Sequence, residues 1–482
     1  MNKSVKKQLL GGVFYTGLSK YAGIVISLIV SAILARLISP EDFGVVAIAT
    51  VFITFFSIFS DLGIGPAIVQ NKNLKKEDLS SIFSFTIYVA VVISLFFFFF
   101  SWIIAWYYKT EILIYICQIL SINIFFATIN IVPNSLLLKE KKFKFIAYRS
   151  LILQLIGGLV SVFAAFGGMG IYALLINPVF TSIGIFLVNF YVNPQSFAWK
   201  INLFSLKLIS TFSIYQFLFN FINYFSRNLD KLMIGKYIGM SPLGYYDKSY
   251  RLMLLPLQNI THVITPVMHP VLAEYQNNLP QLLSHYLKIV HLLAFIGFPL
   301  SVLLFFSSEE LIILIFGDRW MNAVPVFRIL SLSVGVQIIT SSSGSIFQAA
   351  NTTKALFISG LFSAIVNIIG LVIAIFLFGS LEAVAWALVI TFSFSFFQAY
   401  WMLFCRIFKR GLFIFFRELI SPLIISAIIC VVLFIITRII GDMHTIVSLL
   451  IKSVVYGLLL IGYIYIRKEY DLIGLVKNKM KK

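Results

Sequence analysis

The sequence predicts an all-α polytopic membrane protein. Of its 482 residues, 60% are hydrophobic and 11% are charged, whereas a soluble domain keeps about a quarter of its residues charged. Mean hydropathy is +0.99. Apolar runs long enough to cross a bilayer follow one another along most of the chain. A chain of this composition cannot cover a water-facing surface, so a soluble globular fold is excluded.

The polar breaks divide the chain into about fourteen segments that meet the length of roughly 20 mostly apolar residues needed for a span. Several exceed that length, so we expect tilted helices or helices that extend beyond the bilayer. The basic stretch Met1–Gln8 precedes a long apolar helix, which we interpret as a retained first span rather than a signal peptide. The expected spans are 8–38, 43–71, 78–108, 111–138, 143–167, 169–191, 205–238, 241–274, 281–306, 320–350, 353–378, 380–407, 412–438 and 443–466.

The cationic residues indicate an orientation. The net charge of +19 arises mostly from alternate short loops and from the C-terminal tail, so topology explains it and nucleic-acid binding is not needed. The intervening loops hold few cations and include Glu309, Glu310 and Asp318. The positive-inside rule then predicts that both termini are cytoplasmic. The basic loop positions include Lys3, Lys6, Lys7, Lys72, Lys75, Lys76, Lys139, Lys141, Lys142, Lys144, Lys200, Lys207, Lys288, Lys354, Arg406, Lys409, Arg410 and Arg417.

An internal repeat suggests two lobes. At a shift of roughly 200–214 residues, Phe43-Gly44 matches Leu243-Gly244, and Ile119-Leu120-Ser121 matches Ile329-Leu330-Ser331. The repeat unit holds six helices, and an even number relates the two copies by a pseudo-two-fold axis along the membrane normal. We expect an N-terminal lobe over 1–200, a C-terminal lobe over 201–410, and two added helices with a tail over 411–482. Lobes related in this way are expected to enclose a cleft that opens alternately to each side.

Charged residues inside the expected spans concentrate on helices 1, 2, 7 and 8. A charge at the bilayer centre costs about 2.5–3.5 kcal/mol on insertion scales, so each is expected to face a cavity or a partner. Their helical spacing predicts polar stripes that line one cleft, with a ladder of cations suited to a diphosphate. Helix 1 carries Lys20, Ser27 and Ser31, with Arg36 at the outer rim; helix 2 carries Thr50, Thr54, Ser57 and Asp61; helix 7 carries Gln216, Asn220, Asn223, Arg227 and Lys231, with Lys236 at the rim; helix 8 carries Lys248, Arg251, Gln258, His262, Thr265 and His269.

A purely structural interpretation of these charges stays open. Asp230 and Asp247 stand at helical i,i+3 and i,i+4 spacing from Arg227 and Arg251, so they can neutralise those cations. Five expected buried cations nevertheless face three carboxylates, and this imbalance favours an anion site. Asp61 and Asp230 are candidates for coupling to Na⁺ or H⁺, and Asp61 can equally pair with Lys20.

The sequence offers no sign of catalysis. Cys117, Cys405 and Cys430 have no metal-ligand spacing. We find no nucleophile–base set, no metal cluster and no nucleotide-binding glycine loop, and all loops are short. We therefore predict a protein that is not an enzyme and needs no cofactor.

Several runs also resemble a known family. Leu34 to Gly44, Asp61-Leu62-Gly63, Asn228 to Lys236 and Ile315 to Trp320 resemble Wzx-type polysaccharide flippases, in the colanic-acid-exporter-like branch of the multidrug/oligosaccharidyl-lipid/polysaccharide exporter superfamily. The resemblance covers roughly residues 5–410.

That resemblance implies a V-shaped, cationic cleft between two six-helix lobes. It also implies an undecaprenyl-diphosphate-linked oligosaccharide as cargo, flipped from the cytoplasmic to the outer leaflet of a bacterial inner membrane for O-antigen, capsule or exopolysaccharide assembly. A polysaccharide polymerase and a chain-length regulator are expected partners, and the last two helices can form a groove for the lipid tail. A lipid II flippase and a drug/cation antiporter of the same superfamily remain alternatives, although the latter prefers an acidic or neutral cavity. A membrane polymerase or ligase would need a large outer loop, which is absent.

Overall fold

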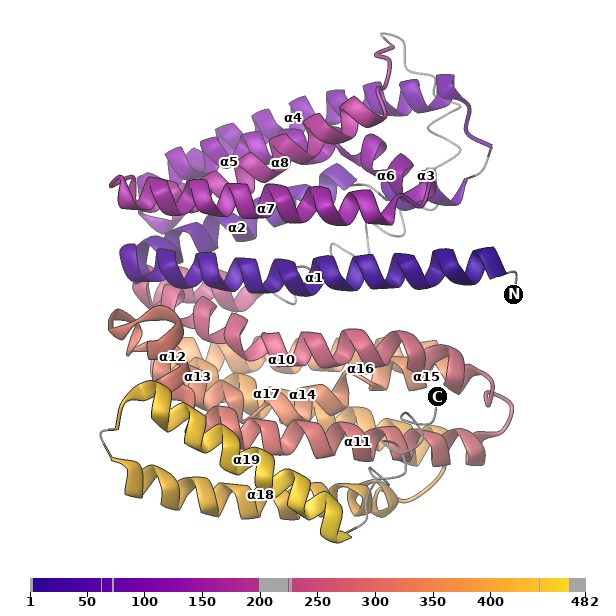
Figure 1. The fold of residues 1–482 in the computed structure, drawn as a ribbon, viewed down its shortest axis with the longest axis vertical. Helices are drawn as coiled ribbons and strands as arrows, with labels where there is room; N and C mark the ends of the chain where they lie inside the picture. Colours follow the sequence, from indigo (N-terminus) through magenta and orange to yellow (C-terminus); the bar gives the residue numbers. More distant parts are fainter. Residues whose placement is uncertain are drawn as a thin grey trace. The chain divides into compact units, whose positions relative to one another are not determined.

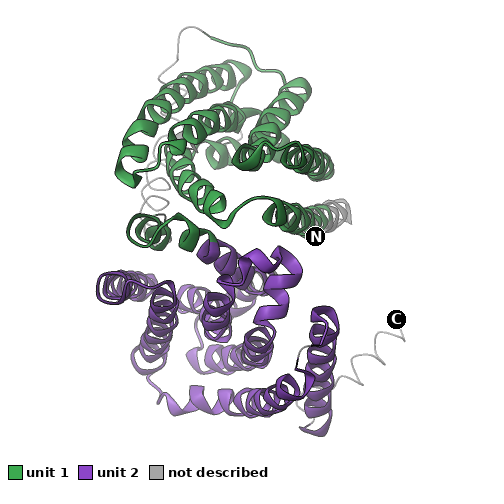
Figure 2. Ribbon diagram, turned by 90° about the vertical axis from the view of Figure 1, so that its left-hand side faces the viewer, with its two compact units in different colours: residues 1–244 green, residues 245–482 purple. Residues whose placement is uncertain are grey.

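The structure is a computed structural model that describes residues 3–61, 63–71, 73–198, 224, 228–441 and 443–467. Within these ranges, the side chains of residues 3–14, 60–61, 262–267 and 269–270 fall outside the description. The described part is helical throughout and contains no strand. It divides into two compact units, residues 1–244 and residues 245–482 (Figure 2).

Unit 1 contains a helical stretch at 228–237, the first residues of α10 and, before them, eight helices of the described residues. These eight helices are α1 (Lys3–Leu37), α2 (Pro40–Asp61), α3 (Ile64–Gln70), α4 (Lys76–Tyr108), α5 (Ile112–Ile129), α6 (Ile131–Lys139), α7 (Phe143–Phe166) and α8 (Ala173–Val192), with a 3₁₀ turn at Gly170–Tyr172 (Figure 1). Helix α1 packs on α7, α7 on α8, α8 on α5, and α5 on α2 and α4.

Unit 2 contains most of α10 (Met240–Ala273) and everything after it. The following helices are α11 (Leu279–Phe306), α12 (Ser308–Phe316), α13 (Ala323–Ser331), α14 (Val334–Thr340), α15 (Ser343–Ala349), α16 (Thr353–Ile373), α17 (Leu381–Trp401), α18 (Phe413–Ile440) and α19 (Thr445–Arg467). A 3₁₀ turn covers Asp318–Trp320, and π-helical turns at Ala374–Phe378 and Met402–Ile407 extend α16 and α17. Helix α11 packs on α18, and α19 packs on α12 and α18.

Eleven helices of the described residues are long and apolar enough to cross a membrane, and the bent pair Ala323–Ser331 and Val334–Ala349 brings the number to 12. The expected seventh span lies largely outside the described residues. The expected eighth span forms as α10, but α10 is not among the helices that pass this test, which agrees with its polar stripe. The all-α polytopic fold is thus confirmed, and the expected number of spans is compatible with the structure.

Some of the expected spans are interrupted. Within 43–71, α2 ends at Asp61 and α3 begins at Ile64, with Gly63 at φ 71° between them. This left-handed conformation suits glycine, because a Cβ would strain it. Within 320–350, the chain bends by 45° between α13 and the helices that follow. Hydrophobic length alone does not reveal either break.

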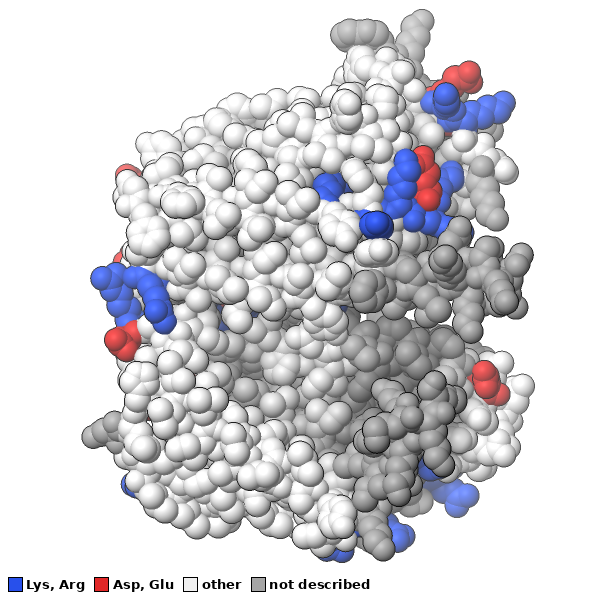
Figure 3. Space-filling model, in the orientation of Figure 1, with Lys and Arg blue, Asp and Glu red and all other residues white. Residues whose placement is uncertain are grey.

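Outward-facing apolar side chains indicate a lipid-facing surface. Phe163 and Phe357 are 72% and 68% exposed, and apolar surface on this scale suits contact with lipid rather than water. On the face of unit 1 shown in Figure 3, Lys and Arg gather at the helix ends where α3 and α6 lie, and the flanks of the helices carry almost no charge. Lys141, Lys142 and Lys144 are exposed in the loop and first turn that follow α6.

The first turns of α2 and α10 cross at two glycines within unit 1. A Cβ on Gly44 would lie 1.8 Å from the carbonyl oxygen of Met240, and a Cβ on Gly244 would lie 1.9 Å from that of Pro40. No side chain fits at either position, so glycine permits the close approach. Gly44 and Gly244 are also the residues matched by the expected repeat, and they occupy equivalent places in this crossing.

Candidate functional site

The charged and polar residues expected to line the cleft lie only partly within the described residues. Asn220, Asn223 and Arg227 lie outside them, and so do the side chains of Asp61, His262 and His269. Lys20, Arg36, Asp230, Lys231 and Lys236 belong to unit 1, and Lys248 and Arg251 belong to unit 2.

In unit 1, the cations differ in their surroundings. Lys20 and Arg36 are exposed on α1, and Lys231 is half-buried. Asp230 is buried, and its Oδ1 accepts a hydrogen bond of 2.8 Å from the backbone N–H of Lys231.

Lys236, expected at the outer rim, is held by the end of α4. Its Nζ donates to the carbonyl oxygen of Tyr107 and lies 4.1 Å from the centroid of that ring. The hydroxyl of Tyr108 donates to the carbonyl oxygen of Leu232 over 3.2 Å. A cation at a helix C-terminus satisfies carbonyl groups that lack helical partners, so these contacts give Lys236 a structural role.

In unit 2, Lys248 and Arg251 stand three residues apart on α10 but differ in exposure. Lys248 is 5% exposed, and its Nζ lies 5.7 Å from the centroid of the Phe316 ring at the end of α12. The side chain of Arg251 is 56% exposed, and its Nε lies 2.8 Å from Oδ2 of Asp247. The expected i,i+4 pair therefore forms.

The Asp247–Arg251 pair occupies only part of the guanidinium. An arginine carries five N–H donors in a planar fork. In the described part of the chain, no residue contacts the two terminal nitrogens of Arg251 within hydrogen-bonding distance. Asp247 thus orients the side chain and leaves a two-pronged donor that matches the geometry of phosphate oxygens.

A buried arginine on α7 was missed by the sequence analysis, which counted charges on four other helices. Arg149 is 8% exposed, and its Nη1 donates to Oδ1 of the fully buried Asn189 on α8. Asn189 donates in turn to Oδ1 of Asn130 over 2.8 Å. The one available signal was a charged residue within the expected span 143–167.

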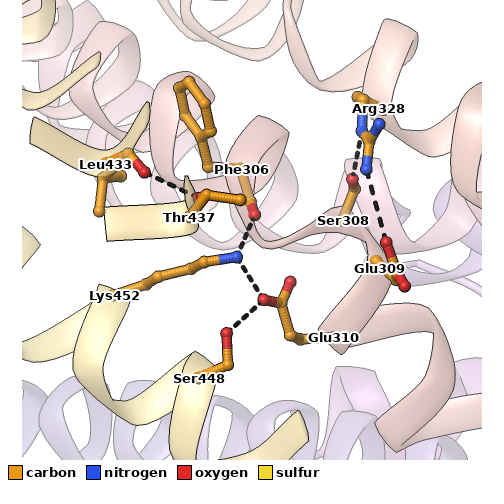
Figure 4. Close-up of polar contacts among 9 residues, drawn as sticks. All are labelled: Phe306, Ser308, Glu309, Glu310, Arg328, Leu433, Thr437, Ser448 and Lys452. Atoms are coloured by element: carbon orange, nitrogen blue, oxygen red, sulfur yellow. Dashed lines mark hydrogen bonds and ion pairs between the residues drawn. The ribbon is translucent and has the colours of Figure 1, made fainter. Parts of the chain in front are cut away.

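A buried ion pair in unit 2 was missed for the same reason. The Nζ of Lys452 on α19 contacts Oε1 of Glu310 on α12 and donates to the carbonyl oxygen of Phe306 over 2.8 Å (Figure 4). The hydroxyl of Ser448 donates to the same Glu310 oxygen over 2.6 Å. Glu310 was assigned to an outer loop, whereas it is 8% exposed and ties α19 to α12.

These residues line a small polar cavity, which we call the ion-pair pocket. Its volume is about 320 Å³, and its walls come from α11, α12, α13, α18 and α19. Arg328 on α13 donates from Nε to the hydroxyl of Ser308 over 2.9 Å. The pocket is lined by Phe306, Glu309, Glu310, Ile313, Arg328, Thr437, Ile440, Gly441, Met443, Thr445, Ser448 and Lys452.

The described residues contain no group of three or more histidine, cysteine, aspartate or glutamate side chains that could hold a metal ion. The free cysteines Cys117, Cys405 and Cys430 form no disulfide.

Comparison with known proteins identifies the family. The family model described as "Polysaccharide biosynthesis protein" matches residues 33–325. Teichuronic acid biosynthesis protein TuaB of Bacillus subtilis (strain 168) is 25% identical over 436 residues, covering 89% of each chain. Lipopolysaccharide biosynthesis protein WzxC of Escherichia coli (strain K12) is 23% identical over 350 residues, covering 72% of this chain and 71% of that protein.

Among solved structures, the lipid II flippase MurJ in an inward closed conformation matches with a TM-score of 0.72 at 18% identity, covering 95% of this chain and 99% of that one. This likeness concerns the fold. The expected resemblance to Wzx-type polysaccharide biosynthesis proteins is confirmed. The chain therefore belongs to the polysaccharide biosynthesis protein family, as a multi-pass membrane protein whose fold is similar to that of MurJ.

Proposed function

We propose that this protein flips a polyprenyl-diphosphate-linked oligosaccharide from the cytoplasmic to the outer leaflet of a bacterial inner membrane, by alternating access, for surface polysaccharide assembly. In this proposal both termini are cytoplasmic, and the diphosphate is received by Lys20, Arg227, Lys231, Lys248 and Arg251. The family and the flippase fold support a transport role. The names of the relatives associate them with surface polysaccharides.

The observation that carries the proposal is the geometry of Arg251. Its guanidinium is fixed by Asp247 through Nε and keeps its two terminal nitrogens available on a half-exposed side chain. A diphosphate presents several oxygens that accept such paired donors. The proposed site also includes Lys248, Lys231 and Lys20, whose positive charges would repel a cationic drug.

Ion coupling belongs to the same proposal. Asp230 is buried beside Lys231, and Asp61 ends α2. A carboxylate that exchanges a proton or Na⁺ between two conformations can draw on the membrane potential, which yields about 2.3 kcal/mol per charge at 100 mV. Replacement of Asp61 or Asp230 by asparagine is expected to change the dependence of transport on an imposed Na⁺ or proton gradient.

The test is complementation of a strain that lacks the gene. Arg251→Ala should lower surface polymer by about tenfold or more, because a charge-assisted contact to the diphosphate is lost, and the lipid-linked precursor should accumulate. Arg438→Ala, at the exposed end of α18, is the matched control and should export normally. Full export by the double variant Arg227→Ala/Arg251→Ala, at normal protein abundance, would refute the diphosphate site.

A lipid II flippase is the second candidate, because the MurJ fold covers 95% of the chain. Rescue of peptidoglycan synthesis in a strain depleted of its own lipid II flippase would favour that substrate. Rescue of surface polymer alone favours the oligosaccharide.

A further inference from the structure

A second polar cavity lies inside unit 1, and none of the residues that line it is charged. It is a groove of about 440 Å³ between α5, α7 and α8, which we call the amide groove. Its volume falls within the range of about 300–1,000 Å³ typical of small-molecule sites. The groove is lined by Asn123, Ala127, Asn130, Gln154, Asn177, Pro178, Thr181, Ser182 and Ile185.

The amide groove lies near the middle of the membrane-spanning helices. Asn123 and Gln154 are each about 16 Å from the first residues of α5 and α7, at 1.5 Å per residue, and the apolar core of a bilayer is about 30 Å thick. Helix α8 packs between α5 and α7 (Figure 1). Amides facing lipid at this depth would leave polar groups unsatisfied. The groove must therefore open to water or to a ligand.

Four amide side chains in the groove are each fixed at one end. The amide nitrogen of Asn123 donates to the carbonyl oxygen of Pro178 over 2.8 Å, and that of Gln154 donates to the carbonyl oxygen of Gly23 over 2.9 Å. The amide oxygen of Asn177 accepts from the hydroxyl of Thr181 over 3.0 Å. That of Asn130 accepts from Asn189 over 2.8 Å.

The other end of each amide has no hydrogen bond to any described residue. This leaves two acceptors, Oδ1 of Asn123 and Oε1 of Gln154, and two donors, Nδ2 of Asn130 and Nδ2 of Asn177. A site for a simple ion would present one polarity. A hydroxyl group both donates and accepts, so a mixed set of fixed amides suits a molecule that carries several hydroxyls.

The electrostatics argue against a cation in the amide groove. None of the nine residues that line it is acidic. The buried cation Arg149 is connected to the groove by hydrogen bonds through Asn189 and Asn130. This network fixes Asn130 with its oxygen toward the arginine and its nitrogen available as a donor. The groove thus favours neutral or acidic groups.

We infer that the amide groove is a saccharide subsite, which holds a sugar residue of the lipid-linked cargo through the hydroxyl groups of that sugar. The inference rests on the proposed function and extends it. In the proposed function, the diphosphate that all such cargo shares is bound by the cations Lys20, Arg227, Lys231, Lys248 and Arg251. The amides of the amide groove recognise the sugar.

The test compares two lipids on the purified full-length protein. One is undecaprenyl diphosphate without sugar. The other is the lipid-linked oligosaccharide extracted from cells that lack this protein and accumulate its cargo. Binding to each is measured for the unchanged protein, for Asn123→Leu/Asn177→Leu, and for Gln154→Leu. Gln118→Leu is the matched control, because Gln118 lies on α5 but does not line the groove.

We expect the unchanged protein and the control to bind the oligosaccharide lipid more tightly than the bare lipid. Each groove variant should lose about 2- to 10-fold in affinity for the oligosaccharide lipid, the effect of a missing hydrogen bond or two, and keep its affinity for the bare lipid. The retained binding also shows that the variant is folded.

The possible failures are distinguishable. If the unchanged protein binds neither lipid, the proposed function fails and the subsite with it. If the unchanged protein prefers the oligosaccharide lipid and the groove variants keep that preference, the proposed function stands and the subsite is wrong. A lack of preference in the unchanged protein, or an equal loss for both lipids in both groove variants, also overturns the subsite.

Discussion

The amide groove of unit 1 and the ion-pair pocket of unit 2 are both polar cavities within apolar helices, but their polar groups are used differently. In the ion-pair pocket, Lys452 and Glu310 contact each other, and Ser448 completes the contact (Figure 4). In the amide groove, each of the four amides is hydrogen-bonded to the protein at one end, and its other end has no hydrogen bond to a described residue.

This difference separates polar groups that hold helices together from polar groups available to a ligand. Lys452 is 3% exposed and anchors α19 to α12, so we interpret the ion-pair pocket as the attachment of the last helix. Arg251 combines both properties, because Asp247 fixes one nitrogen and leaves the others. We expect substitutions of the first kind to affect stability and those of the second kind to affect transport.

Lys452→Met should have the largest effect on stability. It leaves the carboxylate of Glu310 buried without its cation, and breaking a buried ion pair in this way costs about 3–5 kcal/mol. The free energy of unfolding in detergent measures the loss. The double variant Lys452→Met/Glu310→Gln should recover much of it, and a double variant as unstable as the single one would contradict the pairing.

Asn189→Leu should come next. It removes the buried acceptor of Arg149, and a hydrogen bond to a charged group contributes about 1.5–3 kcal/mol. Asn189→Asp keeps an acceptor for the guanidinium and should retain more stability than Asn189→Leu in the same unfolding measurement. Equal losses in the two variants would mean that Arg149 does not depend on this residue.

Ser448→Ala should have a smaller effect, about 1 kcal/mol, because one neutral donor to Glu310 is lost while the ion pair remains. Export of surface polymer should be normal. A loss of export without a loss of stability would instead give the ion-pair pocket a role in transport.

Arg251→Ala should change stability least, by about 0–1 kcal/mol, since its pair with Asp247 is half-exposed. It should nevertheless stop export. Comparison of its unfolding free energy and its export with those of Lys452→Met tests the division between anchoring and transport most sharply. A large stability loss in Arg251→Ala would place it among the anchoring residues.

The sequence predicted the fold well, because hydrophobic length directly determines which segments can cross a bilayer. It did not predict the breaks at Gly63 and between α13 and α14, which depend on backbone conformation rather than composition.

The polar cavities were harder to predict for a different reason. Glu310 and Lys452 are 142 residues apart, and Asn123, Gln154 and Asn177 come from three different spans. A single amide or charge in an apolar helix carries little information, and only packing brings these residues together. The pairing of Arg251 with Asp247 was easier to predict, because the two residues lie one helical turn apart on the same helix.

Reconstitution into liposomes tests the central proposal most directly. The lipid-linked oligosaccharide is placed in the membrane, and the fraction accessible to an external glycosidase is followed with time. We predict that the unchanged protein exposes the inner-leaflet fraction at a rate about tenfold or more above protein-free liposomes, and that Arg251→Ala falls close to the protein-free rate. Equal rates with and without the unchanged protein, under an imposed Na⁺ or proton gradient of either direction, would contradict the account.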